Sequence, residues 1–317
     1  MNLKKRSFVA SLVALAMTGM PVVAQDYPAE PIEIIVPSSA GGSTDTTARI
    51  FAEIAEGKYE GFKFVINNID GSGGQKGFEA IARAEADGYT IGLVFTPQLV
   101  AHVASARAQY TLDNFHVIGN TADDPGIIVV PKDSAIKTVA DLAAAAKSGE
   151  LTAAVNGIGS DDFLAAKAFE EQAGITFNLL PTKGSTEQKA AILGGHVEVA
   201  FMNLSQMEAQ HKAGDAVIIA MLTDARNDLV PDVPTSVEGG FDVQMRATRG
   251  FVTPAGVPAE IQAKLDEMFA DVMADPAFQE KAKASSIYLL NMNGPDYTAY
   301  LQNLQAATQK VFDAAPW

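Results

Sequence analysis

Short apolar runs alternate with amphipathic segments along most of the chain. The run Ile32–Val36 is rich in β-branched residues and stops at Pro37, and Thr90–Phe95 is a second apolar run. Both patterns predict buried strands. Between them, apolar residues recur at helical spacing over 46–56 and 75–84. Such alternation of strands and helices with short links is typical of an α/β fold with a mostly parallel sheet.

The alternation continues through the rest of the chain. We predict further strands at 64–66, 127–130, 152–155, 177–180, 197–201, 217–222, 250–253 and 288–291, and further helices at 139–147, 161–172, 186–193, 205–212, 258–273 and 295–313. The length of 317 residues lies where a single core stops growing and a chain divides into two lobes. We expect the chain to change lobe near Pro125–Gly126 and again near 248–250.

Composition narrows the possible classes of function. The chain is 48% hydrophobic, carries a net charge of -15 and contains no Cys. These values describe a globular protein with a sizeable core, whereas nucleic-acid binding needs a cationic surface. The lack of Cys excludes disulfides, a thiolate nucleophile and Cys-ligated metal sites. We therefore expect no nucleic-acid partner.

The first 24 residues differ from everything after them. Lys4–Arg6 form a cationic head, Phe8–Met17 is an apolar run, and Val22–Ala24 offers small residues before a cleavage point. This order predicts a secretory signal peptide cleaved after Ala24, and hence a periplasmic protein. A membrane anchor is the alternative, but the apolar run is too short and is followed by Pro21. Without its three bases the mature chain carries a net charge of -18.

Glycine-rich turns follow three of the predicted strands, at 38–45, 71–74 and 156–160. Ligands of open α/β sheets bind beyond the carboxyl ends of strands, and helix N-termini attract anions. Each turn taken alone is also consistent with an ordinary strand-to-helix connection that has good capping residues. None of the turns matches a nucleotide-binding motif, so we expect no cofactor.

Residues for catalysis or metal binding are sparse. The four His lie in no metal or catalytic motif, and the chain has no G-x-S-x-G elbow. Asp123–Asp124 and Asp161–Asp162 are adjacent carboxylates, which point apart on a helix, so we interpret them as helix-start charges. Lys183 follows a strand and is either a turn residue or a ligand contact. We predict that the protein is not an enzyme and binds no metal.

Several short segments occur together in a fixed order. They are Tyr27–Pro28, Pro31–Ile32, Pro37, Gly41–Asp45, Asn68, Gly71–Gly74, Ala82–Ala84, Asp87–Thr90, Gly157–Ser160, Lys183–Gly184, Leu193–Gly195, Pro231–Thr235 and Pro254–Pro258. In this respect the chain resembles the substrate-binding proteins of tripartite tricarboxylate transporters, also called the Bordetella uptake gene type. The resemblance extends from Tyr27 to the last residue.

This resemblance implies a two-lobed periplasmic binding protein of type II, in which each lobe is a mostly parallel sheet flanked by helices. We expect a signal peptide at 1–24, lobe 1 at 25–125 plus 249–317, and lobe 2 at 126–248. The implied ligand is a small organic carboxylate with one to three carboxyl groups, amino acids and aromatic acids included. The implied partners are integral permease subunits, and we expect a monomer.

The resemblance also assigns a ligand site. The expected ligand-binding residues are Ser39, Ala40, Gly41, Gly42, Ser43, Thr44, Thr96, Gly157, Gly159, Ser160 and Asn203, with Asp45 as a helix cap. Arg246 and Arg249 are expected either to pair with a second carboxylate or to form a salt bridge at the hinge. Asp161 and Asp162 are alternatively partners for an amine on the ligand. Relatives usually have His where Phe163 stands.

Two other functions stay open from the sequence. A sensor that docks on a membrane signalling protein uses the same fold as a transport receptor. An exported enzyme acting on a similar substrate needs a nucleophile with a partner base, and the chain offers no such pattern. The resemblance favours the transport receptor.

Overall fold

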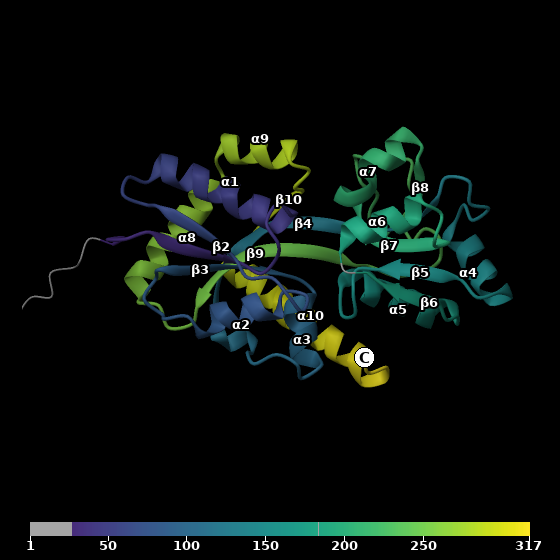
Figure 1. Cartoon of the computed structure of the whole chain (residues 1–317), viewed down its shortest axis with the longest axis horizontal. Helices are drawn as coiled ribbons and strands as arrows, with labels where there is room; N and C mark the ends of the chain where they lie inside the picture. Colours follow the sequence, from purple (N-terminus) through teal and green to yellow (C-terminus); the bar gives the residue numbers. More distant parts are fainter. Residues whose placement is uncertain (1–26, 183) are drawn as a thin grey trace, which may run out of the picture.

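The structure is a computed structural model that describes residues 27–182 and 184–317. The predicted signal peptide with its cleavage point after Ala24, and Lys183, lie outside the described residues. The chain forms two lobes that lie end to end along the longest axis (Figure 1).

Lobe 1 is built from both ends of the described chain. Its elements are β1 (Ile32–Val36), α1 (Ser43–Lys58), β2 (Phe64–Asn68), α2 (Gln75–Arg83), β3 (Thr90–Phe95), α3 (Gln98–Ala104), α8 (Ala259–Met273), α9 (Pro276–Ala284), β10 (Leu289–Asn293) and α10 (Gly294–Ala314). A short 3-10 turn, Leu112–Asn114, precedes the first strand that leaves this lobe.

Lobe 2 is built from one continuous stretch. Its elements are α4 (Val139–Ser148), β5 (Thr152–Val155), α5 (Asp161–Ala173), β6 (Asn178–Pro181), α6 (Ser185–Leu193), β7 (Val199–Asn203), α7 (Leu204–Ala213) and β8 (Ala216–Met221). Two long strands, β4 (Phe115–Pro131) and β9 (Arg246–Pro254), run from lobe 1 toward lobe 2 (Figure 1).

The sheet is mixed, which corrects the expectation of mostly parallel lobes. Among the described residues, four strand pairs are parallel (β1–β2, β1–β3, β5–β6 and β5–β7) and five are antiparallel. Every antiparallel pair includes β4 or β9. The outer strands are therefore parallel, as the strand–helix alternation predicts, and the two strands that connect the lobes run antiparallel to their neighbours.

Strand β4 changes partners where the lobes meet. Its pairing with β9 ends at Pro125, opposite Arg246, and its pairing with β7 begins at Gly126, opposite Asn203. Sequence analysis predicts only 127–130 of this strand, because polar residues and glycines interrupt the apolar pattern before it. Residues of β4 before Ile127 are extended because β9 pairs with one edge of the strand and β10 with the other.

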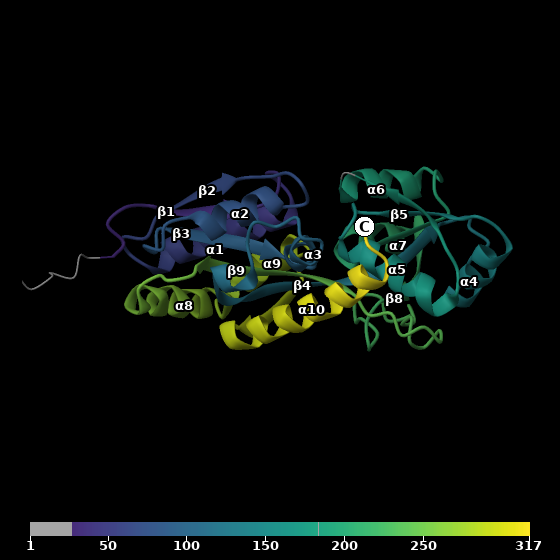
Figure 2. The ribbon, with the colours of Figure 1, turned by 90° about the horizontal axis from the view of Figure 1, so that it is seen from below.

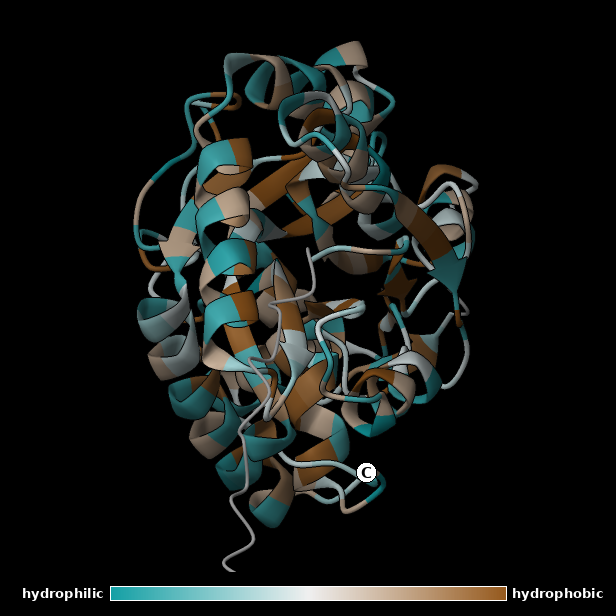
Figure 3. Cartoon of the chain, turned by 90° about the vertical axis from the view of Figure 1, so that its left-hand side faces the viewer, coloured by the Kyte–Doolittle hydropathy of each residue, from teal (hydrophilic) through white to brown (hydrophobic). Residues whose placement is uncertain are grey.

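Each lobe has a core on both faces of its sheet. Ile34 and Val36 face a cluster formed with α1, α8 and α9, whereas Ile35 faces α2, α3 and α10. In lobe 2, Ile128 faces α4 and α5, and Ile127 faces α6 and α7. Figure 3 shows the apolar strands enclosed by helices with hydrophilic outer faces. Within the described residues, none of the helices is long and apolar enough to cross a bilayer.

Candidate functional site

The turn after β1 exposes backbone at the N-terminus of α1. Residues 39–43 are exposed, and Gly42 is the N-cap of the helix. Gly41 has φ +82°, and a Cβ at this position would meet no atom within 4 Å. The predicted residues Ser39, Ala40, Gly41, Gly42 and Ser43 thus form one open turn. Thr44 lies in the first turn of the helix and is only 7% exposed.

The buried side chain of Asp45 fixes the conformation of this turn through hydrogen bonds. The expectation that Asp45 caps α1 is corrected, since the N-cap is Gly42 and Asp45 is the third helical residue. Its carboxylate accepts hydrogen bonds from the Gly41 N–H at 2.8 Å, Arg49 Nε at 2.9 Å and Asn68 Nδ2 at 3.0 Å. Burial opposes ionisation of Asp45, but these hydrogen bonds outweigh it and lower the pKa. The charge of Asp45 therefore stabilises the turn.

A second glycine-rich turn lies beside the first. Ser39 Oγ donates to Asp70 Oδ2 at 2.6 Å and joins the turn after β1 to the turn after β2. The four residues Gly71, Ser72, Gly73 and Gly74 all have positive φ. A Cβ on Gly74 would lie 2.6 Å from the ring of Phe95, so glycine is required there. The two turns form one surface at the carboxyl ends of neighbouring strands.

Thr96 lies behind these turns. Its side chain is fully buried, and its Oγ1 lies 2.7 Å from Thr248 Oγ1 and accepts from the Thr248 N–H at 3.1 Å. Thr248 Oγ1 lies 2.9 Å from the hydroxyl of Tyr297. The Thr96 hydroxyl therefore belongs to a buried hydrogen-bond chain that joins the end of β3 to β9 and α10. It does not reach the glycine-rich turns at 39–43 and 157–160.

The short helix α3 touches turns of both lobes. His102 Nε2 lies 3.2 Å from the carbonyl oxygen of Gly73, in the second turn of lobe 1. Ala101 Cβ lies 3.3 Å from the point that a Cβ on Gly159 of lobe 2 would occupy. Burial lowers the pKa of His102, so its ring is neutral at pH 7. Sequence analysis misses this helix, because no N-cap side chain precedes it and Pro97 holds that position.

The turn after β5 carries the lobe 2 part of the predicted site. Gly157 and Gly159 have φ +76° and +81°. Ser160 is the N-cap of α5, where its Oγ donates to the Gly157 carbonyl at 2.9 Å and accepts from the Phe163 N–H at 3.1 Å. Ser160 is 1% exposed, so its hydroxyl serves the turn. Gly159 is buried as well, so the backbone of this turn that a ligand can reach is that of Gly157, which is half-buried, and Ile158, which is exposed at the tip.

Asn203 and the paired carboxylates lie inside the protein. Asn203 is 3% exposed, and its Nδ2 donates to Asp161 Oδ2 at 2.6 Å and to the Asp124 carbonyl at 3.2 Å. Burial raises the pKa of Asp161 to about 6, and burial together with Asp161 raises that of Asp162. The structure places these side chains in an internal network, against the expectation that Asn203 meets the ligand and against a role for the two acids in binding an amine.

Both arginines near the return crossing pair with acids of β4. Arg246 Nη1 lies 2.8 Å from Asp123 Oδ2, and Arg249 Nη2 lies 3.8 Å from Asp124 Oδ2. The Asp124 carboxylate also accepts hydrogen bonds from the backbone N–H and the hydroxyl of Ser205. Of the two alternatives for these arginines, the structure supports salt bridges where the lobes meet. Sequence analysis could not find Ser205, since it lies 81 residues from its partner.

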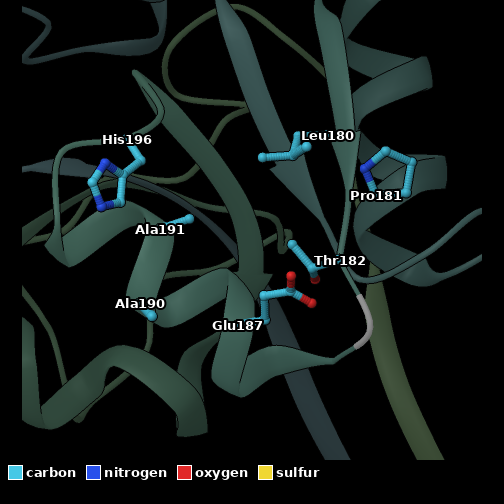
Figure 4. Close-up of a pocket in the computed structure, with 7 residues that line it drawn as sticks. All are labelled: Leu180, Pro181, Thr182, Glu187, Ala190, Ala191 and His196. Atoms are coloured by element: carbon cyan, nitrogen blue, oxygen red, sulfur yellow. The ribbon is translucent and has the colours of Figure 1, made fainter.

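The structure also has two hollows, one of which is lined by Thr182, beside Gly157. One, in lobe 2, has a volume of about 320 Å³ and is lined by the residues labelled in Figure 4: Leu180, Pro181, Thr182, Glu187, Ala190, Ala191 and His196. Another, of about 780 Å³, lies among β4, α8, β10 and α10 of lobe 1. None of the described residues that line either hollow is Lys or Arg, and each lining includes an acid, Glu187 or Asp266. The exposed turns are therefore better suited to an anion than either hollow.

The turns offer the chemistry of anion binding. Helix N-termini carry unpaired N–H groups and about half a positive charge, and glycine allows a ligand to approach the backbone closely. Residues 27–182 and 184–317 contain no group of three His, Asp or Glu side chains that could hold a metal ion. What the site can supply is hydrogen bonds to a carboxylate.

Comparison with known proteins agrees with this geometry. The model of the tripartite tricarboxylate transporter family receptor, TctC, matches residues 48–315. A protein from Agrobacterium vitis, described as the UPF0065 protein in the TAR-I ttuE-ttuC' intergenic region, is 32% identical over 283 residues. That match covers 85% of this chain and 80% of the relative.

Two solved structures share the fold over nearly the whole length. A TctC solute binding protein from Polaromonas, without ligand, superposes with a TM-score of 0.78 at 27% identity and covers 91% of this chain and 99% of its own. The R. palustris protein Rpa4515 with adipate superposes with a TM-score of 0.81 at 25% identity and covers 91% of this chain and 98% of its own.

Proposed function

The chain belongs to the family of tripartite tricarboxylate transporter receptors, which are periplasmic solute-binding proteins, and on that premise we propose that it captures a small organic carboxylate between its two lobes. It then delivers this ligand to the integral subunits of a tripartite tricarboxylate transporter. The protein acts as a monomeric binder and does not change its ligand chemically.

The observation that carries this proposal is the open turn at 39–43. It presents exposed backbone at the N-terminus of α1, while the two carboxylates that contact the turn are both engaged: Asp45 accepts from the Gly41 N–H and Asp70 accepts from Ser39 Oγ. A relative with adipate bound supports a carboxylate as the ligand class. Charge-assisted hydrogen bonds contribute about 1.5–3 kcal/mol each, so a few of them offset the cost of association and give micromolar binding.

The contribution of lobe 2 comes from the turn of Gly157 and Gly159. Gly159 lies beside Ala101 of α3 in lobe 1, so a ligand held by the first turn is close to both lobes when they meet. We assign lobe 1 to residues 25–125 plus 249–317 and lobe 2 to 126–248, because β4 exchanges β9 for β7 between Pro125 and Gly126. The hinge lies in this crossing and in the facing part of β9.

Export is the second part of the proposal. The cationic head and apolar run of residues 1–24 direct the chain to the periplasm, and cleavage follows Ala24. N-terminal sequencing of the protein recovered from a periplasmic fraction tests this. A mature chain beginning at Gln25 supports it, and retention of Met1 in a membrane fraction contradicts it.

A thermal-shift screen tests the ligand class. Mono-, di- and tricarboxylates, amino acids, aromatic acids and neutral sugars are each added to the purified mature protein. A ligand at a hundred times its Kd stabilises the folded state by about 2.7 kcal/mol, which raises the melting temperature measurably. We expect at least one carboxylate to do so. A shift with a neutral sugar and with no carboxylate would contradict the proposal.

Gly42→Val tests the site itself. Gly42 has ordinary extended φ and ψ, and a Cβ there meets only the Ser39 carbonyl at 3.5 Å, so the fold tolerates the change. The added side chain blocks approach to the turn, and we expect binding of the carboxylate found in the screen to be abolished. Gly57→Val is the matched control, since nothing lies within 4 Å of its Cβ position. Normal affinity in Gly42→Val would overturn the site assignment.

A further inference from the structure

Helix α10 extends from lobe 1 to lobe 2. Figure 2 shows α10 running beneath lobe 1 and ending against lobe 2. Near its start, Tyr297 and Leu301 are fully buried in the lobe 1 core beside Ile35. Near its end, Val311 and Trp317 pack against the core of lobe 2. One helix is therefore anchored in both lobes, in addition to the two connecting strands.

Trp317 makes aromatic contacts at the lobe 2 end. Its ring centroid lies 5.5 Å from that of Phe163 at an interplanar angle of 68°, and 4.9 Å from that of Phe312 at 89°. Edge-to-face pairs of this kind contribute beyond the area that they bury. Phe163 lies in the first turn of α5 and donates its backbone N–H to Oγ of Ser160, the N-cap of α5 and the last residue of the turn 157–160. The indole thus contacts Phe163, and Phe163 in turn is hydrogen-bonded to Ser160 of the turn.

Trp317 also touches the turn directly. The point that a Cβ on Gly159 would occupy is 3.5 Å from Trp317 Nε1 and 3.3 Å from Ala101 Cβ. Gly159 therefore lies close to both a helix of lobe 1 and the indole. Trp317 Nε1 is buried and has no hydrogen-bond partner among the described residues. The contact thus depends on the shape of the aromatic ring rather than on a hydrogen bond.

We propose that Trp317 is a positioning residue of the ligand site: carried by a helix anchored in lobe 1, it packs on Phe163 and holds the Gly157–Ser160 turn of lobe 2 against Ala101 of α3. It does not touch the ligand. Ligand affinity depends on this side chain because the turn must lie in place before it can bind a carboxylate. The link to affinity rests on the proposed function, whereas the packing between lobes does not.

The native protein offers a first test, because Trp317 is the only tryptophan in the chain. Acrylamide quenching of its emission is measured in the unliganded protein and compared with N-acetyltryptophanamide. We expect the quenching constant to be several-fold smaller in the folded protein, since the indole nitrogen is buried. Quenching as efficient as that of the free amide would overturn the proposed packing without the use of any variant.

A second test compares Trp317→Ala with Trp317→Phe. In each variant, hydrogen exchange of residues 157–164 is followed by mass spectrometry, with 64–68 in lobe 1 as an internal reference. We expect Trp317→Ala to raise exchange in 157–164 alone, and Trp317→Phe to restore protection, because the contact requires a ring and no N–H bond. Equal exchange in the wild type and Trp317→Ala would overturn the proposal, as would equal loss of protection in both variants. Lys310→Ala, an exposed change on the same helix, is the control.

Affinity is measured separately by calorimetry with adipate and with the carboxylate found in the thermal-shift screen. We expect Trp317→Ala to weaken binding about tenfold or more and Trp317→Phe to stay within about threefold of the wild type. If no carboxylate binds even the wild type while the exchange results hold, the proposed function fails and the positioning role of Trp317 in the turn stands. If a carboxylate binds Trp317→Ala as tightly as the wild type, the link between Trp317 and affinity is wrong.

Discussion

The backbone N–H of Gly41 donates to the carboxylate of Asp45 at 2.8 Å, so a helix residue closes the turn that precedes its own helix. We expect Asp45→Ala to destabilise the protein by about 1–3 kcal/mol, because it removes the buried carboxylate that accepts hydrogen bonds from Gly41, Arg49 and Asn68. Carboxylate binding should weaken as well, since the turn loses its anchor. Chemical denaturation and calorimetry measure the two effects.

Arg49→Gln is the control for Asp45. The Arg49 side chain is 52% exposed, and an ion pair with an exposed partner contributes at most about 1 kcal/mol. The Gly41 and Asn68 hydrogen bonds to Asp45 survive this change. A loss of stability as large as that of Asp45→Ala would show that the ion pair, and not the bond to the turn, is the main effect.

The buried pair of Asp124 and Arg249 should matter far more than an exposed pair of the same kind. Their side chains are 2% and 10% exposed. Asp124→Ala leaves the Arg249 charge buried without its partner, and we expect a loss of about 3–5 kcal/mol. Urea denaturation monitored by circular dichroism gives the value.

A matched surface pair supplies the comparison. Arg226 and Glu238 lie 2.7 Å apart, with side chains 46% and 45% exposed. Glu238→Ala should cost much less stability than Asp124→Ala, although its pair is closer, because water screens exposed charges. Equal losses in Glu238→Ala and Asp124→Ala would mean that burial does not set the strength of the hinge pair.

Because of Asp161, the free energy of unfolding of the protein should decrease as pH rises. Burial raises its pKa from 3.8 to about 6, so between these values the folded state binds more protons than the unfolded state. By linkage, stability is highest below the unfolded pKa and is lost as pH rises through the folded pKa. Asp161→Asn removes this loss and keeps an oxygen that can accept from Asn203. We expect the variant to match the wild type near pH 4 and to exceed it by up to about 3 kcal/mol at pH 7.5.

Asp141→Asn should show the opposite dependence on pH. Hydrogen bonds from Lys137 and Thr138 lower the pKa of this exposed carboxyl, so its contribution to stability is lost as pH falls. The variant should therefore differ most from the wild type at neutral pH, in the destabilising direction. A pH-independent difference for Asp161→Asn would contradict the assignment of its raised pKa.

Gly250 lies where the returning strand passes under α10. A Cβ there would be 2.2 Å from Tyr297 Cε1 and 2.6 Å from the Gly119 carbonyl. Gly250→Ala should therefore destabilise the protein by about 1–3 kcal/mol or more through overpacking. Gly149→Ala is the control, since no atom lies within 4 Å of its Cβ position. Unchanged stability in Gly250→Ala would show that Tyr297 can move aside freely.

The hydrophobic pattern predicts those strands whose limits depend only on neighbouring residues in the sequence. The strands Ile32–Val36, Thr90–Phe95 and Thr152–Val155 are confirmed to the residue, because each is an apolar run bounded by turn residues. The two-lobed α/β fold is confirmed as well. The helix at Pro276–Ala284 was missed although a signal was present: Asp275 caps it and Pro276 takes the first helical position.

The rest of the site depends on contacts between distant residues. The turns at 39–43 and 157–160 can be predicted from the sequence, because glycine and serine directly after a strand indicate a turn that leads into a helix. Whether a polar side chain such as Asn203 faces a ligand or an inner carboxylate depends on Asp161, 42 residues away. The same holds for Trp317, whose partner Phe163 lies in the other lobe.

The use of both ends of the chain in lobe 1 sets an order of events during synthesis. The buried clusters of lobe 2 are complete in sequence once Val243 has been made, whereas the lobe 1 cluster that begins with Ile35 waits for Tyr297 and Leu301. Residues 27–104 therefore leave the ribosome long before their closing partners exist. Lobe 1 therefore cannot bury its full core until almost the whole chain has been made.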